Sequence, residues 1–241
     1  MRYFLSIPRF LIFLLLATLF MILWSLIDLL RVPEKITFRT FRFSALLVKT
    51  LLNIKTKVIG EPPRDTAVII SNHRSYIDVI MMPSKNPYVV LAKKQVRAWP
   101  VIGRAASAIG TLFVERDSRE SRAKTREKIR KKLEDGVSVL IYPEGTTFEG
   151  PGILSFKPGM FHTCAKGGFP IIPVAVEYED KSMAWIGDDT FVPHFLRAFG
   201  KWRVRLTISI GPMMKDTDGE SFRQKVHAWI DEETQRLDKI A

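Results

Sequence analysis

The feature that most constrains this chain is a long apolar run near its N-terminus. Residues 10–30, FLIFLLLATLFMILWSLIDLL, contain Asp28 as their only charged side chain. A helix of about 20 apolar residues is long enough to cross the hydrocarbon core of a bilayer. A cleaved signal peptide has a shorter apolar core and ends in small residues, which the stretch SLIDLLRVPEK does not offer. We therefore expect a retained anchor rather than a removed leader.

Basic residues flank this run unevenly, which predicts its orientation. Arg2 and Arg9 precede it, and the stretch after it is richer in positive charge, at Arg31, Lys35, Arg39, Arg42 and Lys49. The positive-inside rule then places the rest of the chain on the cytoplasmic side of the inner (cytoplasmic) membrane. A second apolar segment, residues 41–54, is either part of a re-entrant or interfacial hairpin or a first helix packed on the soluble domain. Residues 1–54 are thus predicted to form a membrane-anchoring helical region, bitopic or monotopic.

The remaining residues, 55–241, are predicted to form one α/β domain. Apolar runs with β-branched residues predict strands at 66–71, 87–93, 110–116, 137–145, 170–178 and 201–211. The pattern predicts helices at 74–83, 118–136 and 219–240. Strands that alternate with helices indicate a central, mostly parallel β-sheet flanked by helices.

Charge and composition bound the possible partners. A formal net charge of +12 favours a phospholipid surface, an acidic substrate or nucleic acid. The basic helix predicted at 118–136 is mainly a solvated face with i,i+4 ion pairs, and its surplus charge could rest on anionic lipid head groups. No nucleic-acid-reading motif accompanies the charge, so we expect anionic membrane lipids and no nucleic acid. Cys164 is the only cysteine, and the four histidines lack metal-ligand spacing, so no disulfide and no metal site are expected.

A histidine and an aspartate interrupt the apolar stretch IISNHRSYIDVIMM, residues 69–82. His73 and Asp78 lie about 140° apart around an ideal helix, so they meet only if His73 is in the turn before the helix. An aspartate bonded to one ring nitrogen would fix the tautomer and leave the other nitrogen free as a general base. The alternative is a capping Asn72 beside a buried histidine that is satisfied within the core.

Two further stretches place polar residues at the ends of predicted strands, and a third places a proline inside one. GTLFVER ends a strand with Arg116, and YPEGTTF sets Glu144, Gly145 and Thr146 directly after another strand. If the strands are parallel, these residues and His73 end at the same edge of the sheet. The third stretch, PIIPVAV, is an apolar strand. Singly these are a surface arginine, a turn and an edge strand, but together they indicate a site.

In this order and spacing, the motifs resemble those of the glycerolipid acyltransferases, the 1-acylglycerol-3-phosphate (lysophosphatidate) acyltransferase group. NHRSYID resembles the NHxSxxD motif of that family, GTLFVER its second motif, YPEGTT its third and PIIPVAV its fourth. The resemblance covers roughly residues 55–215, and an anchor before the domain is also typical of the family.

This resemblance implies transfer of a fatty acyl group from an acyl-CoA or acyl-carrier-protein thioester to a lysolipid hydroxyl, without a cofactor. His73 would take the hydroxyl proton, and Asp78 would orient the ring and stabilise the imidazolium. The resemblance also implies that the alkoxide attacks the thioester directly, with no acyl-enzyme. The sequence is consistent with this, since it has no Gly-x-Ser-x-Gly elbow and no motif around Cys164. The expected product is phosphatidic acid, made from 1-acylglycerol-3-phosphate in phospholipid biosynthesis.

The resemblance also implies an acceptor-binding group made of Arg116, Glu144, Gly145 and Thr146. Arginine suits a phosphate because its guanidinium can bind two oxygens. One position departs from the family, since the lysophosphatidate enzymes usually have arginine after EGT and this chain has Thr147.

Two alternatives follow from that departure, and two further hypotheses remain open beside it. Lys157 could supply the missing charge, or the acceptor could be another lysolipid, such as a lyso-ornithine or other amino-acid lipid. A membrane-bound thioester hydrolase could use His73 and Asp78 to activate water, and a non-catalytic lipid-binding protein could retain the fold. Acyl-chain length, donor and oligomeric state are not determined by these residues.

Overall fold

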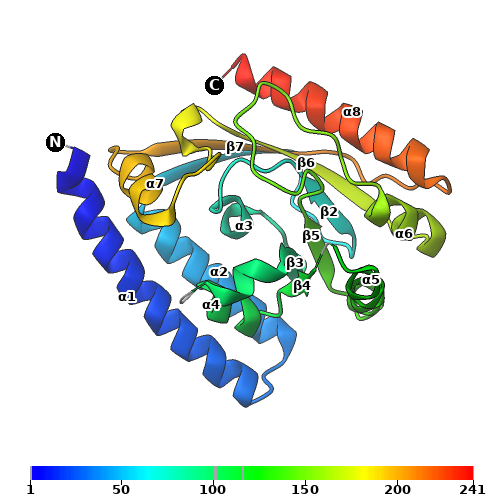
Figure 1. The fold of residues 1–241 in the computed structure, drawn as a ribbon, viewed down its shortest axis with the longest axis horizontal. Coiled ribbons are helices and arrows are strands. Elements are labelled where there is room, and N and C mark those ends of the chain that lie inside the picture. Colours follow the sequence, from blue (N-terminus) through cyan, green and yellow to red (C-terminus); the bar gives the residue numbers. More distant parts are fainter. Residues whose placement is uncertain (1, 100–101, 116, 241) are drawn as a thin grey trace.

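A seven-stranded β-sheet passes through the middle of the molecule and carries helices on both faces (Figure 1). The computed structural model describes residues 2–99, 102–115 and 117–240. All neighbouring strands are parallel except β6 and β7, which confirms the predicted α/β fold with a mostly parallel central sheet. The order across the sheet is β1-β7-β6-β2-β5-β3-β4. The strands are β1 Ile54–Ile59, β2 Val68–Ser71, β3 Tyr88–Lys93, β4 Leu112–Val114, β5 Ser138–Ile141, β6 Ile171–Tyr178 and β7 Val204–Ile210.

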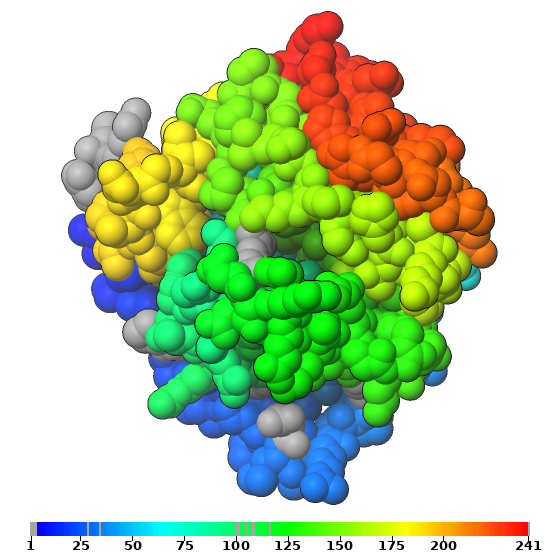
Figure 2. All heavy atoms as spheres, turned by 45° about the vertical axis from the view of Figure 1, so that its right-hand side comes forward, coloured from blue at the N-terminus to red at the C-terminus, as the bar shows by residue number. Residues whose placement is uncertain are grey.

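The helices cover the two faces of the sheet in two groups. One hydrophobic cluster joins the sheet to α1, α2, α3 and α7, and the other joins it to α5, α6 and α8. Figure 2 shows α8 (orange to red) along the upper right of the surface and the α1–α2 hairpin (blue) at the lower left. The helical segments are α1 Arg2–Leu29, α2 Glu34–Leu51, α3 Asp78–Met81, η1 Lys94–Ala98, α4 Ile102–Ala108, α5 Arg119–Glu134, α6 Gly159–Gly167, η2 Lys181–Met183, α7 Phe191–Ala198 and α8 Gly219–Asp238.

The central strands β2 and β5 are buried along their whole length. Because helices cover both faces of the sheet, each strand is a continuous apolar run rather than an alternating one. Ile69 faces the cluster with α1 and α2, whereas Val68 and Ile70 face the cluster with α5, α6 and α8. These buried strands therefore support the polar turns that follow their carboxyl ends.

Strand β6 is an interior strand although it contains Pro173. Proline cannot donate to a sheet ladder and is normally confined to edges or strand starts. Here the ladder between β6 and β7 begins at Val174, opposite Ile210, so the missing N–H lies just outside it. The carbonyl of Pro173 still accepts a bond from the N–H of Gly211.

Several local features differ from the sequence-based expectation; for example, α4 and α7 were not predicted. Strand β1 was not predicted, because it is an edge strand whose alternating Lys55 and Lys57 are exposed and dilute its apolar signal. The helix predicted at 74–83 is only the short α3, because the residues before Asp78 form a turn. The predicted helix at 118–136 is α5, capped by the Ser118 hydroxyl, which accepts a bond from the N–H of Ser121.

The two N-terminal helices form an antiparallel hairpin that packs against the domain. Helix α1 contributes Phe20, Trp24 and Ile27 to the core, and α2 contributes Phe41 and Val48. Most of the segment at 41–54, up to Leu51, thus belongs to a helix that packs on the domain and is at the same time the second arm of a hairpin, and Ile54 begins β1. Among the described residues, one helix is long and apolar enough to cross a membrane, over Phe4–Ile27 with a mean hydropathy of 2.8.

The outer side of α1 is apolar and exposed. Its exposed large side chains recur along the whole helix, at Phe4, Ile7, Leu11, Ile12, Leu15, Leu19, Ile22, Leu23, Leu26 and Leu29. A soluble protein rarely leaves a continuous apolar surface of this kind in water. This surface and the candidate span agree with the expected association with a membrane.

Candidate active site

Two adjacent strands bring the first and third motifs together. Strands β2 and β5 are parallel neighbours, so their carboxyl ends lie at the same edge of the sheet. His73 follows the end of β2, and Tyr142 and Glu144 follow the end of β5. The backbone N–H of His73 donates to Glu144 Oε1 at 2.8 Å, which joins the two motifs directly.

His73 and Asp78 are hydrogen-bonded to each other. His73 Nδ1 and Asp78 Oδ2 are 2.9 Å apart. The contact is possible because Asp78 is the first residue of α3 and His73 lies in the preceding turn. This is the arrangement that the five-residue spacing required. The bond assigns the ring proton to Nδ1 and leaves Nε2 as the acceptor nitrogen.

Asp78 is held in place by further donors on the same turn. Its Oδ2 accepts from the N–H groups of Arg74 and Ser75, both at 2.8 Å, and its Oδ1 accepts from the Tyr178 hydroxyl at 2.7 Å. Burial and the nearby Asp78 carboxylate raise the pKa of Tyr178 well above its usual value, so that phenol remains a donor. A carboxylate with this many donors is fully satisfied although it is buried. Asp78 can therefore hold the imidazole in one orientation.

The ring of His73 is the part of the pair that can reach a substrate. Its side chain is 19% exposed, whereas that of Asp78 is fully buried. Among the residues that the structure describes, none is hydrogen-bonded to Nε2. One face of the ring stacks on Tyr142, with centroids 4.0 Å apart and an interplanar angle of 21°.

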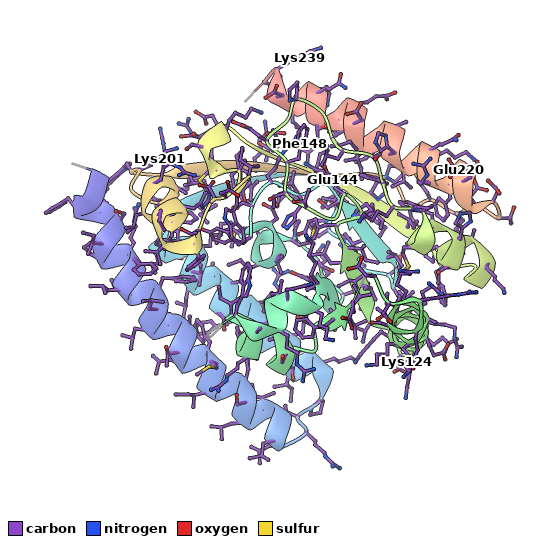
Figure 3. The ribbon with its side chains drawn as sticks, viewed as in Figure 1. Lys124, Glu144, Phe148, Lys201, Glu220 and Lys239 are labelled. Carbon is purple, nitrogen blue, oxygen red and sulfur yellow. The ribbon has the colours of Figure 1, made fainter. Side chains whose placement is uncertain are left out.

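Glu144 connects the site to the loop that follows it. Its Oε2 accepts from the N–H of Leu154 at 2.9 Å, while Oε1 holds the N–H of His73. Burial raises the pKa of Glu144, and these two backbone bonds oppose that shift. Gly145 then turns the chain with a φ of 83°, a conformation that favours glycine. Figure 3 shows the buried Glu144 and the half-buried Phe148 near the middle of the view, whereas Lys124, Glu220 and Lys239 lie nearer its edge.

A cavity of about 490 Å³ opens beside His73. Its polar lining residues include His73, Gly145, Thr146 and Thr147, together with the charged Lys93 and Asp189. The rest is mainly apolar and reaches between the N-terminal hairpin and the domain, with lining from Phe13, Ala17, Phe20, Trp24, Phe41, Ala45, Val48, Ile77, Val79, Ile80 and Val90. His73, whose Nε2 is not bonded to Asp78, therefore lines a mainly apolar cavity.

The structure does not bring all the predicted site residues together. Gly145 and Thr146 line the cavity, as does Thr147, whose hydroxyl donates to the carbonyl of Trp185. Lys157 is exposed and is not part of the cavity lining. Arg116 lies outside the described residues, although β4, which precedes it, is parallel to β3 and therefore ends at the same edge of the sheet.

Sequence reasoning missed a buried ion pair that supports the site. Arg74 Nη2 donates to Glu177 Oε2 at 2.8 Å, and both side chains are 2% exposed. Its other donors bind the carbonyls of Phe148 and Gly152, both at 2.9 Å. The only available signal was charge inside apolar stretches, at Arg74 and at Glu177 in strand β6.

Asn72 is a clamp between strands rather than a helix cap. Its amide donates to the carbonyl of Val176 and accepts from the N–H of the same residue, both at 2.8 Å.

Another histidine, the buried His194, contacts the Tyr76 hydroxyl and the carbonyl of Ala184. In the described part of the chain, no three His, Cys, Asp or Glu side chains gather as metal ligands.

Comparison with known proteins gives consistent results. The chain is 34% identical over 151 residues to a lyso-ornithine lipid O-acyltransferase of Pseudomonas aeruginosa, covering 61% of this chain and 58% of that protein. It is 28% identical to the Rhizobium meliloti enzyme of the same name, covering 78% and 70%, and 30% identical to a 1-acyl-sn-glycerol-3-phosphate acyltransferase of Neisseria gonorrhoeae, covering 48% and 45%.

The fold also matches a solved structure. The crystal structure of the 1-acyl-sn-glycerophosphate acyltransferase PlsC from Thermotoga maritima superposes with a TM-score of 0.73 at 19% identity, over 98% of both chains. The model of the acyltransferase family matches residues 52–177, which contain His73, Asp78 and Glu144. The chain therefore belongs to the acyltransferase family.

Proposed function

We propose that the protein transfers a fatty acyl group from a thioester to the hydroxyl of a lysolipid. The observation that carries this proposal is the His73–Asp78 pair, whose histidine lines a mainly apolar cavity. His73 Nε2 takes the proton of the acceptor hydroxyl as the oxygen attacks the thioester carbonyl. Asp78, bonded to Nδ1, stabilises the imidazolium that forms. Collapse of the tetrahedral intermediate breaks the C–S bond, and the imidazolium returns its proton to the departing thiolate.

A direct attack is favoured over an acyl-enzyme. Cys164, the chain's one thiol, is buried in α6 on the face of the sheet opposite to α1 and α2. Burial raises its pKa to about 12, so the reactive thiolate is scarce at neutral pH. The donor is proposed to be acyl-CoA or acyl carrier protein, and its acyl chain fits the apolar part of the cavity.

Two acceptor classes are compatible with the site. The 1-acylglycerol-3-phosphate acceptor, giving phosphatidic acid, is supported by the matching relatives of that name and by the phosphate-binding chemistry of Arg116. A lyso-ornithine or related amino-acid lipid is supported by Thr147, which replaces the usual arginine, and by the relatives in Pseudomonas and Rhizobium. Thr147 lines the cavity, so it is close enough to influence the choice.

We further propose that the hairpin lies along the cytoplasmic surface of the inner membrane, with the exposed face of α1 in anionic lipid. Arg9 donates to the carbonyl of Phe199, and Trp24 and Ile27 are buried against the domain. Domain contacts thus extend along about 27 Å of the helix, nearly the thickness of the hydrocarbon core. If α1 instead crossed the membrane, the charged Lys201–Asp180 pair beside Arg9 would be drawn into lipid, where charges are costly.

Acyl transfer by the purified protein tests the function. Labelled acyl-CoA and acyl-carrier-protein thioesters are offered with lysophosphatidate, lysophosphatidylcholine or lyso-ornithine lipid, and His73→Ala is run in parallel. We expect one acylated lipid product that is absent with His73→Ala. Thioester consumption without lipid product would indicate a hydrolase, and full activity of His73→Ala would refute the proposed base.

A further inference from the structure

Tyr142 is placed against the ring that the reaction uses. It is the first residue after β5, and β5 is the parallel neighbour of the strand that leads to His73. The two rings are nearly parallel, at 21°, with centroids 4.0 Å apart. Tyr142 is 7% exposed and belongs to the hydrophobic core, so its ring is fixed by its surroundings.

The hydroxyl of Tyr142 does not explain this placement. It is buried, and it has no hydrogen-bond partner among the described residues. Burial raises the pKa of this phenol well above its usual value, and the charge of Asp78 raises it further, so the group stays neutral. A buried hydroxyl without a partner is a cost to the fold. What Tyr142 offers to His73 is therefore the face of its ring.

An aromatic face interacts differently with the two protonation states of an imidazole. When His73 takes the acceptor proton it becomes a cation, and a cation over an aromatic face is attracted by the ring quadrupole. Asp78 meets the same cation in the plane of the ring, through Nδ1. Stacking also opposes rotation of the imidazole and so keeps Nε2 directed away from the Asp78 contact.

Two acidic residues are bonded to His73, and the charged Lys93 and Asp189 line the same cavity. Asp78 from α3 contacts the ring, and Glu144 from the segment after β5 binds the backbone N–H. The guanidinium of Arg74 is turned to Glu177 and the carbonyls of Phe148 and Gly152. Tyr142 is thus the aromatic partner that acts on the imidazolium from above its plane.

We propose that Tyr142 is a positioning residue for His73, which it orients and stabilises as imidazolium through the stacked ring rather than through its hydroxyl. This inference rests on the proposed function, because it assigns a role in the step that makes His73 cationic.

Two substitutions separate the ring from the hydroxyl. Tyr142→Phe keeps the stacked face, and we expect kcat within about twofold of the unmodified protein and equal or higher thermal stability. Tyr142→Leu removes the face, and we expect kcat to fall about tenfold with KM for the lysolipid unchanged. The acid limb of the pH–rate profile should also move to lower pH, because the protonated ring loses stabilisation.

The outcomes are distinct. Loss of kcat in Tyr142→Phe equal to that in Tyr142→Leu would overturn the proposal in favour of the hydroxyl. An unchanged kcat and acid limb in Tyr142→Leu, with His73→Ala inactive, would overturn it while leaving the proposed function intact. An active His73→Ala would instead refute the proposed function itself.

A measurement on the unmodified protein removes any dependence on the folding of Tyr142→Leu. The stacked geometry predicts an upfield ring-current shift of the His73 ring protons, assigned by comparison with His73→Ala. The same protons at ordinary positions would show that the rings are not stacked in solution and would overturn the proposal.

Discussion

Two adjacent residues, His73 and Arg74, each donate a hydrogen bond to a buried carboxylate, with opposite consequences. His73 shares one nitrogen with Asp78 and keeps the other at the edge of a cavity. Arg74 directs its donors to Glu177 and to two backbone carbonyls, and its side chain is almost fully buried. The Nε2 of His73, which is not bonded to Asp78, is available for proton transfer. The donors of Arg74 are occupied by protein acceptors, so this residue can only stabilise the fold. Activity and stability should therefore separate between neighbouring positions.

The largest expected effect is on activity, at His73. His73→Gln should lower kcat by about 10²- to 10⁴-fold, because the general base is lost. The free energy of unfolding should change by less than about 1 kcal/mol, because the ring is partly exposed at a cavity. Turnover of labelled thioester and urea denaturation measure the two quantities. Comparable losses of stability and activity in His73→Gln would contradict the separation of activity at His73 from stability at Arg74.

The next effect is on stability, at Arg74. Arg74→Met should lower the free energy of unfolding by about 3–5 kcal/mol, because Glu177 is left as a buried charge without its main partner. It should also release the loop that Arg74 holds through Phe148 and Gly152. Denaturant unfolding and limited proteolysis of residues 148–152 check this. The double variant Arg74→Met with Glu177→Gln is the control, and it should recover part of the loss because no charge is left unpaired.

The smallest effect is expected at Lys181, which also contacts Glu177. Lys181 Nζ is 2.8 Å from Glu177 Oε1, but its side chain is 37% exposed. Lys181→Ala should therefore change the free energy of unfolding by less than about 1 kcal/mol, because exposed ion pairs are weak. The same denaturant titration measures it. A loss as large as that of Arg74→Met would mean that Glu177 depends on both cations.

Local patterns predicted much of the fold. Most strands follow from apolar runs, and α5 from its helical pattern; both signals act over a few residues. The edge strand β1 was missed because a strand with one solvated face and exposed lysines resembles a polar linker. The short α3 was overestimated because backbone N–H groups bind the Asp78 carboxylate instead of continuing a helix.

The candidate site was predicted in part, because some of its contacts also depend on residues close together in the sequence. The spacing allowed a His73–Asp78 contact with His73 in the turn before the helix, but it also allowed a buried histidine beside a capping Asn72, and the structure shows the contact. Glu144 was predicted as an acceptor-binding group, but its carboxylate holds the N–H groups of His73 and Leu154. That arrangement depends on which strand lies beside β2, which no local pattern states.

The sequence by itself determined the class of the fold, the apolar N-terminal helix and the candidate histidine–aspartate pair, because each is encoded in the periodicity or spacing of neighbouring residues. Only the tertiary structure decided that Arg74 is a structural clamp, that Lys157 is exposed and does not line the cavity, and that Tyr142 stacks on His73. Those outcomes depend on strand order and on burial, which are set by long-range packing between segments far apart in the chain.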